Sequence, residues 1–210
     1  MAAGRPRDAA AERRILDATF RLIGERGCGQ VRIDDIASAA GVGKQTIYRW
    51  WPTRSAVVLD ALLAATLVDT PFPLTDSARG DFRTHLRSVA RLFASPSGAL
   101  IREMVAESQA DPAVADDFRT RFWAPRRELS LARLERGIAE GQVRRDIPRE
   151  PALDALYGPL WIGLLVSHRA LDARYADEVL DAVWAGVEAR PVSDRSAAAS
   201  ASDSGMRRGG

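Results

Sequence analysis

Apolar residues recur at intervals of three and four along most of this chain, and that spacing is the feature that most narrows its possible folds. The pattern is most regular from Leu153 to Leu165 and from Val179 to Val187. Residues three or four apart share one face of a helix, whereas a half-buried strand needs alternating apolar and polar residues, which no long stretch provides. The sequence therefore predicts an all-α protein, with about nine helices.

Glycine and proline mark where these helices begin and end. Helices are predicted over about 8–26, 33–40, 44–51 and 54–68, followed by a break at Pro71 and Pro73 and a larger helical bundle behind. Within the bundle, Pro125 is expected to interrupt or kink a helix. The pair Gly158 and Pro159 is expected to kink another without ending it.

Bulk properties exclude several classes of protein. The chain has 210 residues, enough for one core and a small second domain, and no apolar run reaches the roughly 18 residues of a membrane span. Its first residues do not resemble a secretory signal, and its single cysteine, Cys28, cannot form an internal disulfide. These features favour a cytoplasmic protein.

Positive charge is concentrated at the front of the chain. The net charge is only +2, but residues 1–56 contain ten Lys or Arg and six Asp or Glu. The remainder is slightly acidic. A positive field confined to one end is what a phosphate backbone would attract.

Two short predicted helices are joined by the turn Gly41-Val42-Gly43, which is the pattern of a helix-turn-helix. The second helix starts with a run of hydrogen-bond donors, and a helix enters a DNA major groove by this end. Ile47 and Trp51 are expected to face inward. The spacing alone leaves DNA binding and a solvated polar face about equally open. The donors are Lys44, Gln45, Thr46, Tyr48 and Arg49.

The stretch from Ile36 through the Gly41 turn to Arg54 resembles the TetR family of bacterial transcriptional regulators. The resemblance is close over about residues 10–60, and farther along it extends to helix number and length. It implies that Lys44 and Tyr48 contact phosphates and that Arg54 does so at the start of the fourth helix. It also makes Gln45, Thr46 and Arg49 candidates near base edges.

Four positions depart from the family pattern. Gly43 replaces a capping Ser, and Arg32 stands where Ser or Thr commonly caps the second helix, a loss that Asp34 and Asp35 could offset through the helix dipole. Gln45 replaces a frequent Gly and could pair with adenine. Trp50 replaces a His that often meets the DNA backbone. Ahead of the first helix, Arg5 and Arg7 could reach a minor groove or could form only a mobile charged terminus.

The predicted domains are a flexible basic arm (1–9), the DNA-binding domain (10–53), a ligand-binding and dimerisation domain (54–190) and a disordered tail (191–210). The rear domain offers large side chains for an effector pocket, although ordinary core is the simpler interpretation of each. The pocket candidates are His85, Val89, Phe93, Met104, Phe118, Phe122, Trp123, Tyr157, Trp161 and Leu165.

No motif for catalysis or a cofactor is present, and two histidines, His85 and His168, without neighbouring cysteines make a poor metal site. The row Arg79, Arg83, Arg87 and Arg91 is interpreted as a solvated face that could attract an acidic ligand or partner.

The expected function is a homodimeric repressor that a small apolar or aromatic effector releases from an inverted-repeat operator in double-stranded DNA. An activator, a corepressor-dependent regulator and a helical ligand-binding protein without DNA function are the alternatives. The apolar stripes of the last two helices are predicted to form the dimer interface. Its candidates are Leu153, Leu160, Leu164, Leu180, Val183, Trp184 and Val187.

Overall fold

The computed structural model describes residues 8–66, 70 and 72–189. The predicted basic arm with Arg5 and Arg7 and the predicted tail lie almost entirely outside these residues. The described part contains ten α-helices, a short 3-10 turn (Cys28–Gln30) and a π-helical turn, η2 (Arg119–Trp123). The helices are α1 Ala9–Arg26, α2 Ile33–Ala40, α3 Lys44–Trp50, α4 Arg54–Thr66, α5 Ala78–Ala94, α6 Pro96–Ser108, α7 Pro112–Phe118, α8 Ala124–Ala139, α9 Arg149–Val166 and α10 Ala173–Val187.

The all-α prediction is confirmed. Because α7, η2 and α8 follow one another without a break, the described residues form nine continuous α-helical segments. Extended pairing among these residues is limited to one isolated bridge between Val143 and Glu188. None of the helices described is long and apolar enough to cross a membrane.

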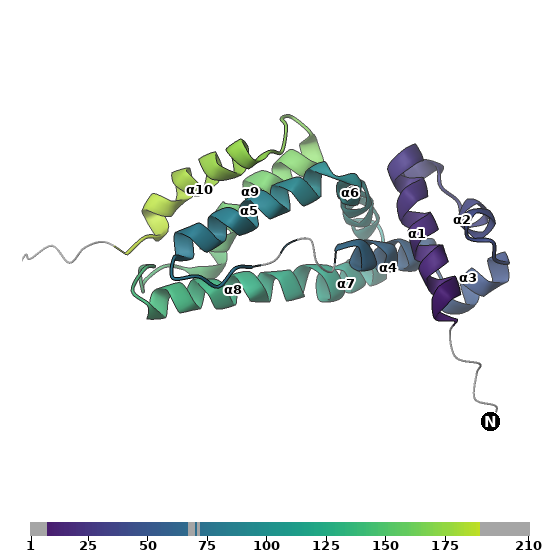
Figure 1. Cartoon of the computed structure of the whole chain (residues 1–210), viewed down its shortest axis with the longest axis horizontal. Coiled ribbons are helices and arrows are strands. Elements are labelled where there is room, and N and C mark those ends of the chain that lie inside the picture. Colours follow the sequence, from purple (N-terminus) through teal and green to yellow (C-terminus); the bar gives the residue numbers. More distant parts are fainter. Residues whose placement is uncertain (1–7, 67–69, 71, 190–210) are drawn as a thin grey trace, which may run out of the picture.

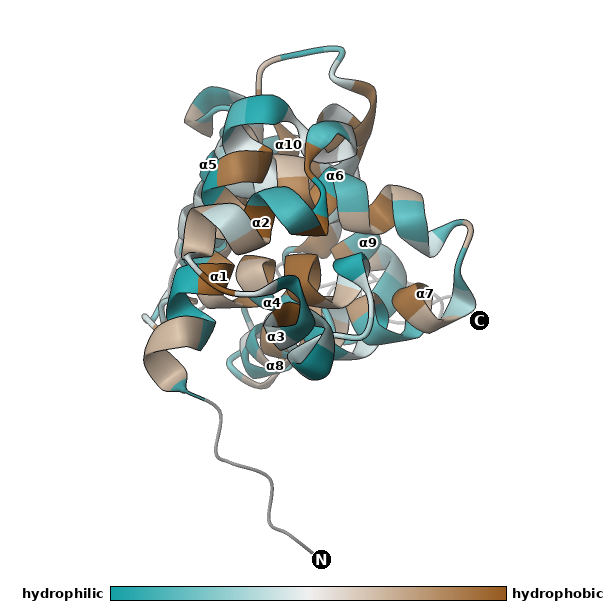
Figure 2. Ribbon diagram, turned by 90° about the vertical axis from the view of Figure 1, so that its right-hand side faces the viewer, coloured by the Kyte–Doolittle hydropathy of each residue, from teal (hydrophilic) through white to brown (hydrophobic). Residues whose placement is uncertain are grey.

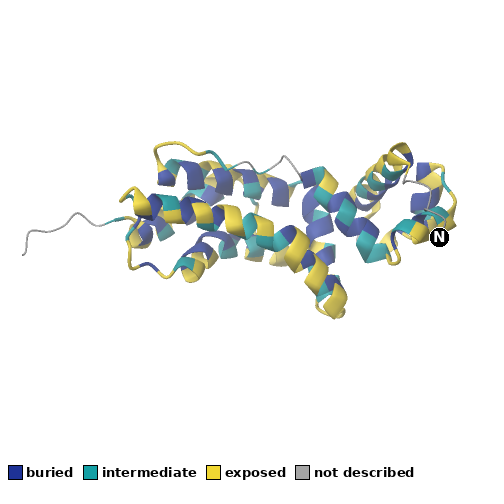
Figure 3. Ribbon diagram, turned by 90° about the horizontal axis from the view of Figure 1, so that it is seen from below, coloured by how far each residue is buried: buried dark blue, intermediate teal, exposed yellow. Residues whose placement is uncertain are grey.

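The helices lie in two groups along an elongated molecule (Figure 1). Helices α1, α2 and α3 form one end, and α5, α8, α9 and α10 form a bundle at the other. Between them, α4 packs against α1 on one side and α6 on the other. Figure 3 shows buried residues on the inner faces of helices at both ends, and these residues belong to one apolar core that extends through both groups of helices.

Both predicted proline irregularities are present, in different forms. Pro159 lies inside α9, which continues to Val166. Pro125 follows the π-helical turn η2, in which each carbonyl is paired one residue farther along than in an α-helix. Pro125 has no N–H to donate to the carbonyl of Arg121, and this favours the wider turn immediately before it.

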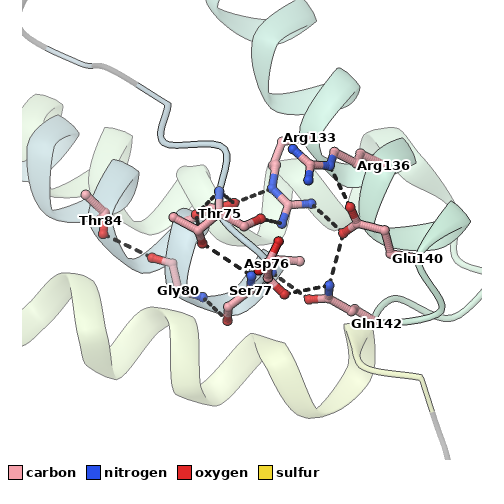
Figure 4. A network of polar contacts seen from close by, with 11 residues as sticks. Thr75, Asp76, Ser77, Gly80, Thr84, Arg133, Arg136, Glu140 and Gln142 are labelled. Carbon is pink, nitrogen blue, oxygen red and sulfur yellow. Dashed lines mark hydrogen bonds and ion pairs between the residues drawn. The ribbon is translucent and has the colours of Figure 1, made fainter.

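A buried ion pair fastens the end of the bundle farthest from α1–α3 (Figure 4). Arg133 Nε donates to Asp81 Oδ2 at 2.5 Å, and both side chains are almost completely buried. Asp81 also accepts from the Thr75 hydroxyl at 2.6 Å and from the Thr75 N–H at 3.1 Å. The network therefore joins α8, α5 and the segment that leads into α5.

The row of arginines on α5 faces solvent, as predicted, since Arg79, Arg87 and Arg91 are exposed and Arg83 is half-buried, but three of the four also pair with acids of α10. Arg79 and Arg83 both bind Asp181 of α10 at 2.9 Å, and Arg87 binds Asp177 of α10 at 2.5 Å. The fold supplies an acidic partner from about one hundred residues away, and the row links two helices of the same protomer.

Candidate nucleic-acid interface and ligand cavity

The turn between α2 and α3 places α3 at the surface. Gly41 ends α2 in the left-handed conformation, with φ 65°, which glycine adopts without strain. Val42 N–H then donates back to the Ala37 carbonyl at 3.0 Å. Gly43 has an extended backbone and is the N-cap residue that precedes α3. Ile47 is 0% exposed and fixes the inner face of the helix.

The outer face of α3 carries the donors predicted from sequence. Lys44, Gln45, Tyr48 and Arg49 are exposed, whereas Thr46 is half-buried. Figure 2 views the molecule from the end that carries α1–α3 and shows hydrophilic residues along α3. The helix thus presents a polar face to solvent at the edge of the molecule.

The cations of this face have only exposed or aromatic partners among the described residues. Lys44 Nζ lies 2.9 Å from Asp34 Oδ1, and both side chains are about half exposed or more. The hydrogen bond to Asp34 raises the pKa of the Lys44 ammonium, so this group stays charged. The Arg49 guanidinium lies 5.7 Å from the Trp50 ring centre, and half-buried Trp50 packs edge-on against Trp51.

The missing cap of α2 is replaced by a hydrogen bond as well as by charge. Asp35 Oδ2 accepts from the backbone N–H of Arg32 at 2.8 Å, which is half of a capping box. At the other end of α2, Arg14 Nε of α1 donates to the Ala40 carbonyl at 3.2 Å. The first contact is local to the start of α2, and the second ties α2, and hence α3, to α1.

Arg54 occupies a different place from the phosphate contact that the resemblance implied. Its Nε donates to the Val31 carbonyl at 2.9 Å, and its Nη1 contacts Glu103 at 2.7 Å and Glu107 at 2.8 Å. Its side chain is 25% exposed. Because two carboxylates of α6 already neutralise it, Arg54 connects the front domain to the bundle, and we remove it from the DNA-contacting set.

The bundle has a partly open cavity next to η2. It offers about 60 Å³ to the centres of water-sized molecules, so a ring-sized ligand would need its walls to shift. Seven of the ten pocket residues proposed from sequence line it. These are His85, Val89, Phe93, Phe122, Trp123, Tyr157 and Trp161.

A second, outer groove adjoins this cavity and offers about 400 Å³ on the same measure. Trp123, Tyr157 and Trp161 line both, and the two indoles lie 5.3 Å apart between ring centres. The remaining candidates lie elsewhere: Phe118 and Leu165 line the outer groove, and Met104 is 1% exposed in the core and lines neither cavity.

Besides His85 and Tyr157, the cavity has polar residues that were not predicted from the sequence. Arg126, Arg127 and Ser130 of α8 line it, together with Thr70 and Leu92. The available signal was the four-residue spacing of Phe122, Arg126 and Ser130, which puts polar groups on the same helix face as a predicted pocket residue.

Two further polar groups in the cavity have partners. The Ser130 hydroxyl donates to the Tyr157 hydroxyl at 3.0 Å, and burial raises the pKa of Tyr157, which keeps it protonated. His85 is 4% exposed and stacks on Phe72 at 4.3 Å between ring centres. His168 is exposed and lies outside the cavity. In the part of the chain that the structure describes, no cluster of three His, Cys, Asp or Glu could hold a metal.

The residues predicted to form a dimer interface lie mostly in the protomer's own core. Leu153, Leu160, Leu164, Leu180, Trp184 and Val187 are each at most 2% exposed, and Val183 is half-buried. Side chains already buried within one protomer have no surface left for a second. The regular stripes of α9 and α10 therefore hold the bundle together.

The opposite face of α9 is apolar and exposed. Ile162 is 55% exposed, Leu165 46% and Val166 66%. On α10, Ala182, Ala185 and Gly186 are exposed. We call these six residues the α9–α10 outer face.

Comparison with known proteins agrees with both halves of this description. Residues 15–61 match the sequence model for bacterial regulatory proteins of the tetR family, and residues 72–183 match that for the tetracyclin repressor-like C-terminal domain. The chain is 35% identical over 191 residues to the HTH-type transcriptional regulator YdeS of Bacillus subtilis, which covers 91% of this chain and 96% of YdeS.

Other relatives extend the comparison. The HTH-type transcriptional regulator AqdR of Rhodococcus erythropolis is 36% identical over 138 residues, covering 65% of this chain and 66% of AqdR. The crystal structure of the TetR family regulator SCO0332 superposes with a TM-score of 0.71 at 28% identity, covering 84% of this chain and 98% of that one.

Proposed function

Because the chain belongs to the TetR family of bacterial transcriptional regulators, we propose that it is a homodimeric repressor released from an inverted-repeat operator by a small-molecule effector. DNA binding and transcriptional regulation follow from the family. The dimer, the operator symmetry, the effector and the repressor role are the proposal. Since bacterial DNA lies in the cytoplasm, the proposed place of action is cytoplasmic.

The observation that carries the proposal is the exposed polar face of α3. We assign Lys44 and Tyr48 to phosphates, Gln45, Thr46 and Arg49 to base edges, and half-buried Trp50 to the rim of the contact. In the free protein, Asp34 binds the Lys44 ammonium at the surface. A DNA phosphate would replace this carboxylate, and the exchange costs little because both groups are solvated.

The α9–α10 outer face supports a dimer. Ile162, Leu165 and Val166 recur at three- and four-residue spacing on α9, and small residues on α10 allow a second helix pair to approach closely. A two-fold axis through this face would relate two α3 helices, so the operator half-sites would lie roughly 34–36 Å apart or at a multiple of this distance.

A chain of polar contacts through α4 offers a path from the cavity to α3. The Trp51 indole N–H at the end of α3 donates to Asp60 Oδ2 of α4 at 2.7 Å. Asp60 Oδ1 pairs with Arg121 in the π-helical turn that also carries Phe122 and Trp123 of the cavity wall. An effector that reshapes this turn would alter the position of α4 and, through Trp51, of α3.

The direct test is an electrophoretic mobility shift over about 50–200 mM salt, with operator fragments selected from genomic DNA by the purified protein. We expect inverted repeats and a steep loss of affinity with salt. Replacing Lys44 by Ala should lower the log–log salt slope by about 0.9, one phosphate contact. Selection of unrepeated sites, or an unchanged slope for Lys44→Ala, would contradict the proposed interface.

Analytical ultracentrifugation tests the dimer. Ile162→Glu places a charge on the α9–α10 outer face and should convert a micromolar dimer into a monomer with an unchanged helical circular dichroism spectrum. Leu129→Glu is the matched control, because Leu129 is also 54% exposed but lies on α8. A wild-type protein that sediments as a monomer, or an Ile162→Glu variant that remains a dimer, would contradict this interface.

A further inference from the structure

The cavity beside η2 contains two arginines in very different electrostatic states. Arg127 lies 2.6 Å from Glu150 and 2.7 Å from Asp154, so two carboxylates offset its charge. Arg126 has no carboxylate partner among the described residues. A guanidinium remains protonated in proteins, so Arg126 brings to the cavity wall a positive charge that no carboxylate of the described residues offsets.

The hydrogen bonds of Arg126 engage both Nη atoms and leave Nε without a partner among the described residues. Nη1 donates to the Phe122 carbonyl at 3.0 Å, and Nη2 donates to the Thr66 hydroxyl at 2.8 Å, with the Thr66 carbonyl at 3.4 Å. Nε is buried and has no hydrogen-bond partner among the described residues. A buried donor left unpaired costs free energy, and burial also lowers the pKa of this side chain. Both costs would be relieved by an anion.

The rest of the wall is aromatic and apolar. The centre of the Phe122 ring lies 3.9 Å from the guanidinium carbon of Arg126. The cavity is also lined by Phe93, Trp123, Tyr157 and Trp161. An inorganic anion would gain nothing from these rings. A planar aromatic body would stack against them while its charged group reached Arg126.

From this arrangement we propose that the effector is an aromatic carboxylic acid, whose carboxylate binds the Nε and Nη2 edge of Arg126 while its ring lies among Phe122, Trp123 and Trp161. The proposal rests on the effector site proposed above and names its ligand class. Carboxylates bind this edge of a guanidinium through two parallel hydrogen bonds. The outer groove beyond Trp123 and Trp161 provides room for a larger ring system or a substituent.

The same geometry connects binding with release. Nη2 of Arg126 now holds Thr66, the last residue of α4. A carboxylate that takes the Nε and Nη2 edge competes with Thr66 for this nitrogen. Ligand binding would therefore loosen the end of α4, the helix that also contacts Trp51 through Asp60.

The test compares each acid with its neutral amide, which has nearly the same shape. Binding of benzoate, benzamide, 1-naphthoate and 1-naphthamide to the full-length protein is measured by calorimetry near neutral pH. At least one acid should bind about tenfold more tightly than its amide, the value of a charge-assisted hydrogen-bond pair. Arg126→Gln should abolish this preference, and Arg126→Lys should restore part of it.

Arg119→Gln is the matched control. It removes one positive charge from η2, the turn that precedes α8, but Arg119 is exposed and pairs with Asp116 outside the cavity. It should leave the preference for the acid unchanged. The proposal is overturned if no acid binds more tightly than its amide, including the case in which none binds, or if Arg126→Gln keeps the preference.

The mobility shift separates this result from failure of the repressor proposal. If the amides bind as well as the acids and release DNA, the ligand class is wrong and the ligand-released repressor stands. If an acid binds through Arg126 without affecting DNA binding, the ligand class stands and release by this ligand is wrong.

Discussion

The two ends of the molecule treat their positive charges in opposite ways. On α3, Lys44 and Arg49 are exposed, and among the described residues they contact a solvated carboxylate and aromatic rings. In the bundle, Arg133 is buried against Asp81, and the arginines of α5 pair with acids of α10. The pairs of the bundle join separate helices, α8 to α5 and α5 to α10, whereas the only carboxylate that Lys44 contacts in the described chain is the exposed one of Asp34. Among the described arginines that are not exposed, Arg126 alone has no carboxylate partner, and that is why it draws attention as a ligand contact.

The largest expected effect tests whether the bundle depends on its internal pairs. Asp81→Ala leaves the buried Arg133 guanidinium without its carboxylate and should lower the free energy of unfolding by about 3–5 kcal/mol. Urea denaturation followed by circular dichroism measures it. The matched control is Asp181→Ala, which removes an exposed carboxylate that also binds arginines. Similar losses for the two variants would erase the distinction between buried and exposed pairs.

The next prediction tests whether α3 is built for recognition and contributes little to stability. Gln45→Ala should cost about 1–3 kcal/mol of operator binding and relax preference at one base pair per half-site, because an amide that reads a base is lost. Binding to random DNA and the unfolding midpoint should barely change, since Gln45 is exposed. If the variant loses as much affinity for random DNA as for the operator, Gln45 contacts the DNA backbone and does not read a base.

A third prediction concerns the contact that joins the two ends. Asp60→Ala removes the carboxylate shared by Trp51 and Arg121 and should reduce the effector's influence on operator affinity by about 1–3 kcal/mol, a typical coupling free energy. Effector affinity itself should change little. Operator titrations with and without saturating effector measure this, with Asp116→Ala as the control, because Asp116 of α7 also pairs with an arginine of η2, Arg119. If the effector weakens operator binding as much in Asp60→Ala as in the wild-type protein, the coupling does not run through Asp60.

The smallest expected effect concerns the surface pairs between α5 and α10. The hydrogen bond from Arg87 lowers the pKa of Asp177 in the folded protein. Its stabilisation is therefore fully present above the unfolded pKa, about 3.9, and is lost as pH falls through the lower folded value. Asp177→Asn should cost about 1 kcal/mol or less near neutral pH and nothing at the acid end. A pH-independent difference would show that charge is not its source.

The fold and the recognition helix could be predicted because their signals are local. Helix periodicity, the glycine turn at Gly41 and the donors from Lys44 to Arg49 all lie within a few residues of the structure they specify. The same local signal misled at Leu160 and Trp184. An apolar stripe shows that a helix face is covered, but it does not show whether the cover comes from the same chain or from a second one.

The sequence by itself determined the helical architecture, the turn that sets up α3 and the polar face of α3, because each depends on side chains adjacent along the backbone. Only the tertiary structure decided which charges are neutralised. Arg54 is paired by α6, Arg87 by α10 and Arg127 by α9, from partners twenty to ninety residues away. Arg126 and Arg127 are neighbours in the sequence, yet Arg127 meets two carboxylates and Arg126 meets none in the described chain, because α8 turns them toward different surroundings.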